Sequence, residues 1–346
     1  MKKTIITQLI TVFKKESFTL KQAYEICPQN HPESVRARIY ESLGDLFIRV
    51  EKGVYEATLE GLRTIFIEGE GRDLSFLEEN SIDAIITDYP WLDKTAHKGG
   101  NRNFANSYEG FQYSQSDFNE KACVLKPGSF LVEFMPLESE SNWQELARIK
   151  QLAVNAGLQY YAKVPYIENN IRNTGRTSKA GGDILIFTKG KARALRPDAK
   201  KNKANGVSSG YFMSGAAGML PVQFEAPLPP KKELRHQSMK SLALIKSLLG
   251  YFTKEEDVVL DQFSGSFVVS KACQELKRYS IGIEKDPVLV ERATEWFNES
   301  GACVLHVLDQ VVDSVKNISS IAVEKIDPHD WKNSCEDYYG KQLSLF

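Results

Sequence analysis

Two short segments carry residues suited to chemistry at an amino group on a planar ring. In the first, the apolar run 84–87 is followed by Asp88, Tyr89, Pro90 and Trp91. The Asp88 carboxylate and the Tyr89 backbone carbonyl can each accept a hydrogen bond from an amino group, and the Trp91 indole can stack on a base. Such contacts would direct a nitrogen lone pair toward an electrophilic carbon. A turn that simply buries a tryptophan is the alternative interpretation.

The second segment indicates a pocket for an adenosine-containing ligand. An apolar strand, 258–260, leads into the turn Asp261-Gln262-Phe263-Ser264-Gly265-Ser266, and Glu284 ends the next strand, 19 positions after Gly265. A glycine-containing turn brings backbone N–H groups close to a ligand, and an acid at this spacing can accept both ribose hydroxyls. The dinucleotide fingerprint of three spaced glycines is missing from the sequence, which disfavours a nicotinamide enzyme.

Together the two segments resemble the DNA amino-methyltransferases that use S-adenosylmethionine, in the permuted, beta-type order that places the catalytic segment before the cofactor segment. Residues 88–91 are similar to that family's catalytic Asp-Pro-Pro-Tyr/Trp, and residues 261–267 to its Asp-Pro-Phe-x-Gly-Ser-Gly. Three further motifs are collinear with the family: residues 69–74 resemble Gly-Asp-Gly-Arg-Asp-Leu, residues 125–128 are Leu-Lys-Pro-Gly, and residues 236–241 resemble His-Pro-x-x-Lys-Pro. The resemblance covers roughly residues 64 to 297.

The resemblance implies a bacterial or phage-type modification enzyme that flips an adenine out of duplex DNA. Asp88 and the Tyr89 carbonyl would orient its amino group toward the methyl donor, with Pro90 and Trp91 completing the catalytic segment. An acid at position 88, where cytosine-modifying relatives generally carry serine, favours adenine. The cofactor-binding positions that the resemblance implies are Asp261, Phe263, Ser264, Gly265, Ser266, Glu284, His236, Lys240 and Glu70.

Two departures from the family pattern keep other interpretations open. Tyr89 replaces a proline, and Phe267 replaces the second glycine of the cofactor loop, where close backbone approach is usual. A methyltransferase fold that has lost methyl transfer and acts as a DNA-binding regulator or replication accessory is therefore one alternative. Methylation of cytosine N4, or of RNA, is another, because these substrates offer a similar amino group.

The elements that must position these segments alternate between strands and helices. This alternation predicts a doubly wound, Rossmann-like α/β sheet, whose ligands bind at the carboxyl ends of the strands. We assign residues 59–320 to this methyltransferase domain. The expected strands are 64–68, 84–87, 129–134, 183–188, 258–260 and 280–283, and the expected helices are 143–156 and 267–276.

Residues 1–58 are expected to form a separate N-terminal domain. Three helical segments precede two short strands, 47–50 and 54–55, which are joined by a turn. Three helices and a hairpin resemble a winged helix, in which Arg36 and Arg38 of the third helix would meet DNA. A module that only packs or contacts protein is the alternative.

Charge is uneven along the chain, although 44 basic and 45 acidic residues nearly cancel. Residues 170–205 carry a net charge of +8, whereas residues 282–346 carry −6. The basic stretch lies in a Gly-, Ser-, Pro- and Lys-rich insert, 170–235, where permuted enzymes carry their target-recognition region, so it is predicted to track the phosphates of double-stranded DNA. A solvated surface loop is the alternative. The insert residues expected to contact DNA are Arg172, Arg176, Lys179, Arg193, Arg196, Lys200 and Lys201.

The tail, 321–346, ends in a candidate partner-binding peptide. Gln342-Leu343-Ser344-Leu345-Phe346 resembles the peptide by which bacterial replication and repair proteins dock on the sliding clamp, with a terminal strand folded onto the core as the alternative. Five cysteines without Cys-x-x-Cys spacing favour a reducing cytoplasm, and no metal-binding cluster is visible in the sequence. No apolar run approaches the roughly 20 residues of a membrane span.

Overall fold

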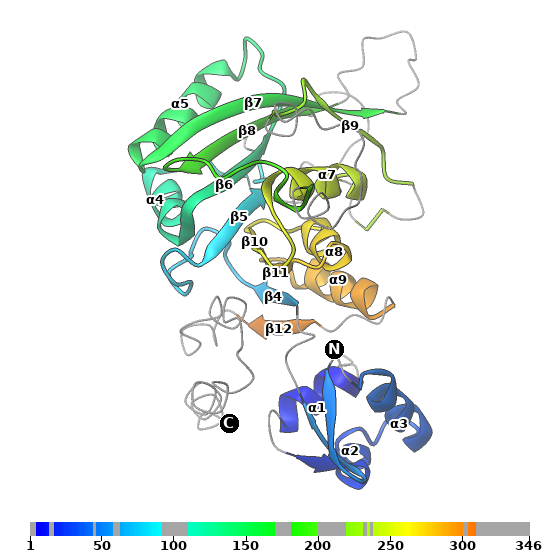
Figure 1. The fold of residues 1–346 in the computed structure, drawn as a ribbon. Coiled ribbons are helices and arrows are strands. Elements are labelled where there is room, and N and C mark those ends of the chain that lie inside the picture. The colour runs from blue at the N-terminus through cyan, green and yellow to red at the C-terminus, as the bar shows by residue number, and fades with distance from the viewer. Residues whose placement is uncertain are drawn as a thin grey trace.

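The computed structural model describes most of the chain, in ten segments. Within them, a small N-terminal unit precedes a large sheet that has helices on both faces (Figure 1). The described residues are 5–13, 17–43, 46–57, 63–91, 110–169, 181–199, 219–230, 234–235, 238–299 and 304–308.

The N-terminal unit packs three helices against a three-stranded antiparallel sheet in the order β1-β3-β2. Thr19 and Gln22 form a capping box that fixes the start of the second helix. Phe18, Ile39 and Tyr55 are buried between the helices and the sheet. The elements are α1 (Ile5–Phe13), β1 (Phe18–Thr19), α2 (Leu20–Ile26), α3 (Pro32–Glu41), β2 (Phe47–Glu51) and β3 (Val54–Ala57).

The main sheet has nine strands within the described residues. The six from β12 to β6 run parallel, and β8 is antiparallel to both of its neighbours, β6 and β7. β5 is buried along its whole length, as an apolar strand covered on both faces should be. In spatial order the strands are β12 (Leu305–Leu308), β4 (Thr64–Glu68), β11 (Tyr279–Glu284), β10 (Val258–Asp261), β5 (Ile82–Thr87), β6 (Leu125–Met135), β8 (Gly182–Lys189), β7 (Leu158–Asn169) and β9 (Phe224–Pro227).

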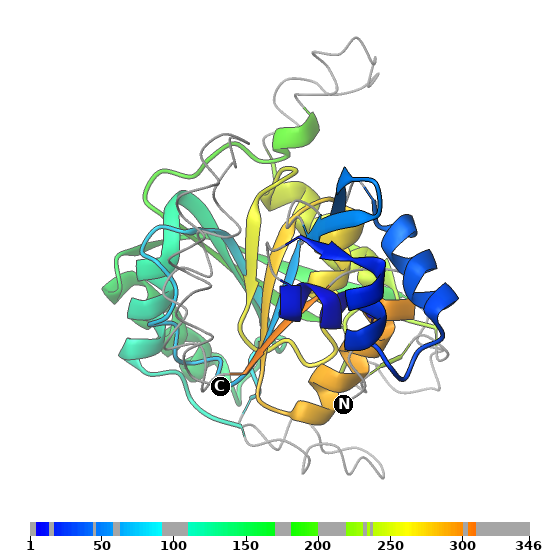
Figure 2. The ribbon, with the colours of Figure 1, turned by 90° about the horizontal axis from the view of Figure 1, so that it is seen from below.

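Helices cover the two faces of this sheet in separate layers. α4 (Gln115–Val124) and α5 (Trp143–Asn155) pack on one face, where Phe118 and Ile149 join the core. α7 (Leu242–Phe252), α8 (Val268–Glu275) and α9 (Pro287–Glu299) cover the other. Figure 2 shows the sheet between the two layers from below. The predicted doubly wound α/β architecture is therefore confirmed.

The order of the strands creates a crevice between β10 and β5. From β10 the chain continues to β11 on one side, and from β5 it continues to β6 on the other. In open α/β sheets, ligands bind outside the carboxyl ends of the strands at such a switch point. The residues that end β10 and β5 are therefore placed to form a site.

The structure differs from the prediction at one turn and in several elements that the sequence did not predict: helices α4, α7 and α9 and strands β1, β7, β9 and β12. Residues 125–128, expected as a turn, already belong to β6, because Leu125 pairs with Ile82 before a register shift moves the pairing to Phe130 and Ala84. Gly128 adopts φ 83° within this irregular stretch, a conformation that favours glycine. The long strand β7 was not predicted, because exposed Tyr160 and Tyr161 interrupt its apolar alternation.

Candidate active site

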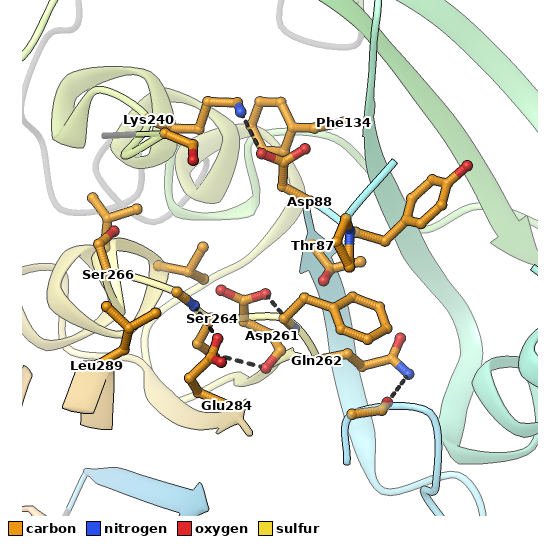
Figure 3. Close-up of a pocket in the computed structure, with 18 of the residues that line it drawn as sticks. Thr87, Asp88, Phe134, Lys240, Asp261, Gln262, Ser264, Ser266, Glu284 and Leu289 are labelled. Carbon is orange, nitrogen blue, oxygen red and sulfur yellow. Dashed lines mark hydrogen bonds and ion pairs between the residues drawn. The ribbon is translucent and has the colours of Figure 1, made fainter. Parts of the chain in front are cut away.

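Three carboxylates meet at the carboxyl edge of the sheet because they end three adjacent strands. Asp261 is the last residue of β10, Glu284 is the last residue of β11, and Asp88 directly follows Thr87 at the end of β5 (Figure 3). A cavity of 1140 Å³ opens there, and all three residues line it. The structure thus brings the two chemistry-bearing segments of the sequence into one pocket.

Nearly all of the catalytic and cofactor residues proposed from the sequence line this cavity. Catalytic candidates Asp88, Tyr89, Pro90 and Trp91 all do so. His236 lies outside the described residues. The cofactor candidates that line the cavity are Glu70, Lys240, Asp261, Phe263, Ser264, Gly265, Ser266 and Glu284.

The carboxylate of Asp88 is paired with the ammonium group of Lys240 (Figure 3). The Lys240 nitrogen also lies 5.2 Å from the centre of the Phe134 ring. Burial alone would lower the pKa of Lys240, but the charge of Asp88 and their hydrogen bond outweigh it, so the pKa lies above its usual value and the ammonium stays charged. The resemblance grouped Lys240 with the cofactor residues, whereas its contact is with the catalytic candidate.

The side chain of Tyr89 is held in an aromatic cluster. Its ring is 2% exposed, with its centre 4.1 Å from that of Tyr113, 4.6 Å from Trp91 and 5.5 Å from Phe111. The Phe111 N–H donates to the Pro90 carbonyl at 3.3 Å. Burial raises the pKa of the Tyr89 phenol far above its usual value, which keeps it neutral. Packing therefore supplies the rigidity that a proline at position 89 would give.

A fully buried ionic triad lies beneath this cluster. Lys121 of α4 pairs with Glu133 of β6, and it also donates to the Tyr113 hydroxyl at 2.7 Å. That hydroxyl donates in turn to the second oxygen of Glu133 at 3.0 Å. Burial lowers the pKa of Lys121 and raises that of Glu133. These contacts anchor Tyr113, against which the Tyr89 ring packs at a tilt.

Asp261 is the most strongly perturbed acid that faces the cavity. Its side chain is almost entirely buried, and its carboxylate accepts the Phe263 N–H at 3.4 Å. Burial raises the pKa of Asp261 to about 7. Among the described residues it has no ion-pair partner, so a bound cation would meet an uncompensated carboxylate.

Glu284 holds the glycine-containing turn in place. One oxygen accepts the Gly265 N–H at 2.8 Å, and the other accepts the Asp286 N–H at 2.9 Å. The Lys285 N–H also contributes a hydrogen bond to this side chain. A carboxylate has about four acceptor sites, so Glu284 can still accept a hydroxyl group of a ligand. The sequence suggested that the turn would present its N–H groups to the ligand. This expectation is wrong for Gly265, and also for Ser264, whose N–H donates to the Ile283 carbonyl at 2.9 Å.

The ring of Phe267 lies outside the cavity. The residue adopts a left-handed conformation, with φ 57°, at the start of α8, and its ring centre lies 4.0 Å from that of Phe66 in a buried cluster with Phe297. The ring fits beside β11 because residue 282 of that strand is glycine. A Cβ atom at this position would lie only 2.8 Å from the Phe267 ring. The side chain that departs from the family pattern is thus accommodated by a glycine on the neighbouring strand.

The turn that carries Glu70 is bound tightly to the loop after β10. A Cβ atom at Gly71 would lie 1.9 Å from the Gln262 carbonyl oxygen, so only glycine fits there. The Gln262 amide donates to the Gly71 carbonyl at 2.7 Å (Figure 3). Gln262 therefore fixes one wall of the cavity, a role that its sequence position did not reveal.

Two arginines predicted to contact DNA lie at the opposite edge of the sheet. Arg193 pairs with Asp257 at 2.8 Å, where β10 begins, and donates to the Asp83 carbonyl at 2.9 Å, near the start of β5. Arg196 lies over the ring of Tyr251, at the carboxyl end of α7. Both guanidinium groups are thus engaged near the amino ends of the strands, away from the cavity, and DNA contact by these two residues stays a prediction.

The other basic candidates divide into exposed and undescribed residues. Arg36 and Arg38 are exposed on α3, each paired with a glutamate three residues away, Glu33 and Glu41 respectively. The remaining predicted residues lie outside the described part of the chain: Arg172, Arg176, Lys179, Lys200, Lys201, and the clamp peptide Gln342, Leu343, Ser344, Leu345 and Phe346.

Within the part of the chain that the structure describes, no helix is both long and apolar enough to cross a membrane. Nor do three or more histidine, cysteine or acidic side chains gather there in a way that could hold a metal ion.

The fold and the site together define an α/β protein that binds a ligand at a topological switch point lined by acids. The family model described as DNA methylase, of the N6/N4 type, matches residues 82–295. Over 227 residues the chain is 31% identical to the type II methyltransferase M.HpaI of Haemophilus parainfluenzae, covering 64% of this chain and 70% of that protein. The chain therefore belongs to the N6/N4 family of DNA methylases.

Two solved structures give more distant likenesses. The M1.HpyAVI–SAM complex is 20% identical, with a TM-score of 0.48, over 68% of this chain and 99% of that one. PvuII DNA methyltransferase, described as cytosine-N4-specific, is 15% identical, with a TM-score of 0.48, over 70% of this chain and 96% of that one. Likeness at this level does not assign a target base.

Proposed function

We propose that this protein transfers a methyl group from S-adenosylmethionine to the N6 amino group of adenine in double-stranded DNA, as a site-specific modification enzyme of the permuted type. Membership of the DNA methylase family supports the reaction class. The observation that carries the proposal is the shared cavity of Asp88, Asp261 and Glu284 at the switch point of the sheet. Asp88 precedes Asp261 in the chain, as the permuted order requires.

The Asp261–Glu284 half of the cavity fits the methyl donor. A buried Asp261 without a cationic partner among the described residues suits a ligand that carries positive charge, and Glu284 keeps acceptor capacity for a ribose hydroxyl. When bound, S-adenosylmethionine supplies a methyl group on a sulfonium ion. Phe263, which lines the same half, is available to pack against an adenine ring.

The Asp88 half of the cavity fits the target base. The Asp88 carboxylate accepts a hydrogen bond from the amino group and stabilises the positive charge that develops on nitrogen as the N–C bond forms and the carbon–sulfur bond breaks, which leaves the donor sulfur as a neutral thioether. The methylated nitrogen then loses a proton. The Tyr89 carbonyl, held by the aromatic cluster, is the second acceptor. Trp91 lines the cavity beside them, where it can stack on a flipped base with a contribution of about 1–3 kcal/mol.

Two observations favour an active adenine enzyme over the alternatives. Phe267 replaces a glycine of the family pattern, and this replacement was the reason to consider a regulator that has lost methyl transfer. Its ring packs away from the cavity and leaves the pocket open. An acid rather than serine at position 88 favours adenine over cytosine, on the resemblance described above.

Methyl transfer from labelled S-adenosylmethionine tests this function. Genomic duplex DNA and total RNA are the two substrates, and mass spectrometry of the hydrolysed nucleosides separates N6-methyladenine from N4-methylcytosine. We expect N6-methyladenine in DNA, and sequencing of modified bases in cells that express the protein would give the recognition sequence. Label only in cytosine, only in RNA or in neither would refute the proposal.

The DNA surface is proposed to include α3 and the parts of the insert 170–235 that flank the buried strand β8, without Arg193 and Arg196. Each phosphate contact should add about −0.9 to the slope of log affinity against log salt. Neutralising Lys200 and Lys201 together should therefore make the slope less steep by about 2, and neutralising Arg36 should test the N-terminal unit in the same way. Docking of residues 342–346 on a sliding clamp stays a prediction, and clamp pull-down with these five residues deleted would test it.

A further inference from the structure

The ion pair between Lys240 and Asp88 engages the carboxylate that the proposed reaction assigns to the target amino group. A carboxylate has two oxygens, and Lys240 takes one of them, Oδ2. The ammonium lies toward the cavity and over the Phe134 ring, in the part of the pocket where an amino group would approach Asp88 (Figure 3). An ammonium and an exocyclic amino group are both N–H donors, so they compete for the same acceptor.

The charge of Lys240 also opposes the chemistry proposed for Asp88. Methyl transfer moves positive charge from sulfur to the amino nitrogen, so the reaction is fastest when the full negative charge of Asp88 faces that nitrogen. A lysine that stayed on the carboxylate would neutralise part of this charge. The pair therefore suits the base-free state better than the transition state.

A second carboxylate lies next to Lys240 and can receive it. Glu168, near the end of β7, accepts the N–H of Ser241, the residue that follows Lys240, at 3.3 Å. Its side chain is half-buried, and burial raises its pKa, so the group gains from a cationic partner. The Lys240 side chain is flexible, with four methylene groups, and can turn from one carboxylate to the other.

We propose that Lys240 pairs with Asp88 in the base-free enzyme and is displaced by the amino group of the flipped base. Its ammonium group then pairs with Glu168 instead. The inference rests on the proposed function, and it makes Lys240 and Glu168 positioning residues. Replacement of one donor by another leaves Asp88 hydrogen-bonded throughout, so the carboxylate is never stranded in a partly buried site.

The test compares duplexes that carry adenine or purine at the modified position of the recognition sequence, which the sequencing of modified bases is to supply. Purine lacks the amino group, so the ratio of the two affinities reports how much that group contributes. In the wild type the amino group must displace Lys240, and we expect a ratio within about threefold. In Lys240→Met the acceptor is free, and the ratio should rise to about tenfold or more, as expected for a hydrogen bond to a charged group.

Glu168→Gln and Lys240→Arg complete the set. Without the Glu168 charge the ammonium loses its second site, so the single-turnover rate of methyl transfer should fall about tenfold while the affinity for S-adenosylmethionine stays the same. Lys240→Arg keeps a cation that can reach either carboxylate, and it should retain the wild-type affinity ratio. Thermal unfolding of each variant separates these effects from misfolding.

Three results would overturn the proposal. An affinity ratio that is equal in wild type, Lys240→Met and Lys240→Arg would show that Lys240 does not compete with the amino group. Loss of S-adenosylmethionine binding in Lys240→Met with an unchanged ratio would make Lys240 a cofactor ligand. An unaffected rate in Glu168→Gln would remove the second site. These results differ from the result expected if the proposed function were wrong. In that case the wild type would transfer no methyl group to adenine.

Discussion

The two edges of the main sheet use the same residue type in opposite ways. At the amino edge, Asp83 accepts Lys126 at 2.7 Å and the Val258 N–H at 3.0 Å, while Arg193 pairs with Asp257. At the carboxyl edge of the same two strands, Asp88 has one lysine and Asp261 has no cation within the described residues. At the amino edge, side chains of the protein itself thus neutralise the aspartates. At the carboxyl edge, negative charge is left that a bound ligand can neutralise.

The largest effect is expected at the carboxyl edge. Asp88→Ala removes the acceptor of the amino group and should lower the single-turnover rate of methyl transfer by about 10⁴-fold, near the upper end for a group that acts directly at the reacting atom. Calorimetry should show S-adenosylmethionine binding within about twofold of wild type, because Asp261 and Glu284 are untouched. An equal loss of cofactor binding would contradict the division of the cavity into two halves.

The amino edge should respond to mutation through stability instead. Arg193→Met leaves Asp257 buried without its cation and should lower the free energy of unfolding by about 3–5 kcal/mol in urea titrations. The rate of methyl transfer per folded molecule should not change. Lys126→Met is the matched control with a smaller effect, because Asp83 keeps the Val258 N–H. If Arg193→Met had normal stability but weaker DNA binding, Arg193 would be a DNA-contacting residue rather than a structural one.

A steric change behind the cofactor loop should have an intermediate effect. Gly282→Ala places a methyl group against the Phe267 ring and should cost about 1–3 kcal/mol of stability. Phe267→Leu shortens the contacting ring, so the cost of the alanine should be smaller in the double variant than in the single one. Equal costs in the two backgrounds would show that the strand and the loop are not coupled.

The smallest effect is a pH dependence set by Asp261. With a pKa of about 7, this carboxyl is mostly protonated at pH 6 and mostly ionised at pH 8, and a cationic ligand prefers the ionised form. The affinity for S-adenosylmethionine should therefore rise about tenfold between these pH values, and Asp261→Asn should abolish the rise. In the unliganded protein the sign is opposite, since a raised carboxyl pKa makes stability fall as pH rises from about 4 to 7. Calorimetry and thermal unfolding measure the two trends.

The sequence was sufficient to predict those site residues that lie at the ends of strands. Asp88, Asp261 and Glu284 each follow an apolar run, so their meeting at one edge follows from the parallel alternation alone. The aromatic residues after Asp88 were also recognisable as neighbours of the site. Local pattern was sufficient because the relevant residues are adjacent to the strands that carry them.

Contacts between distant segments could not be predicted in this way. Arg193 looked like part of a basic loop, but its partners, Asp257 and Asp83, lie 64 and 110 positions away. Lys121 and Glu133 each lie in a segment with other charged residues, and nothing in the sequence shows that these two pair. Side-chain destinations of this kind depend on strand order and register, which one sequence does not specify.

The packing of Phe267 against Gly282 constrains the evolutionary history of the cofactor loop. A lineage that first acquired phenylalanine at 267 while keeping a side chain at 282 would have passed through a clashing intermediate. Such an intermediate would lose about 1–3 kcal/mol of stability, so the order in which glycine is present before the ring is favoured. A side chain at position 282 is disfavoured for as long as the ring persists, and we expect the two residues to be inherited together.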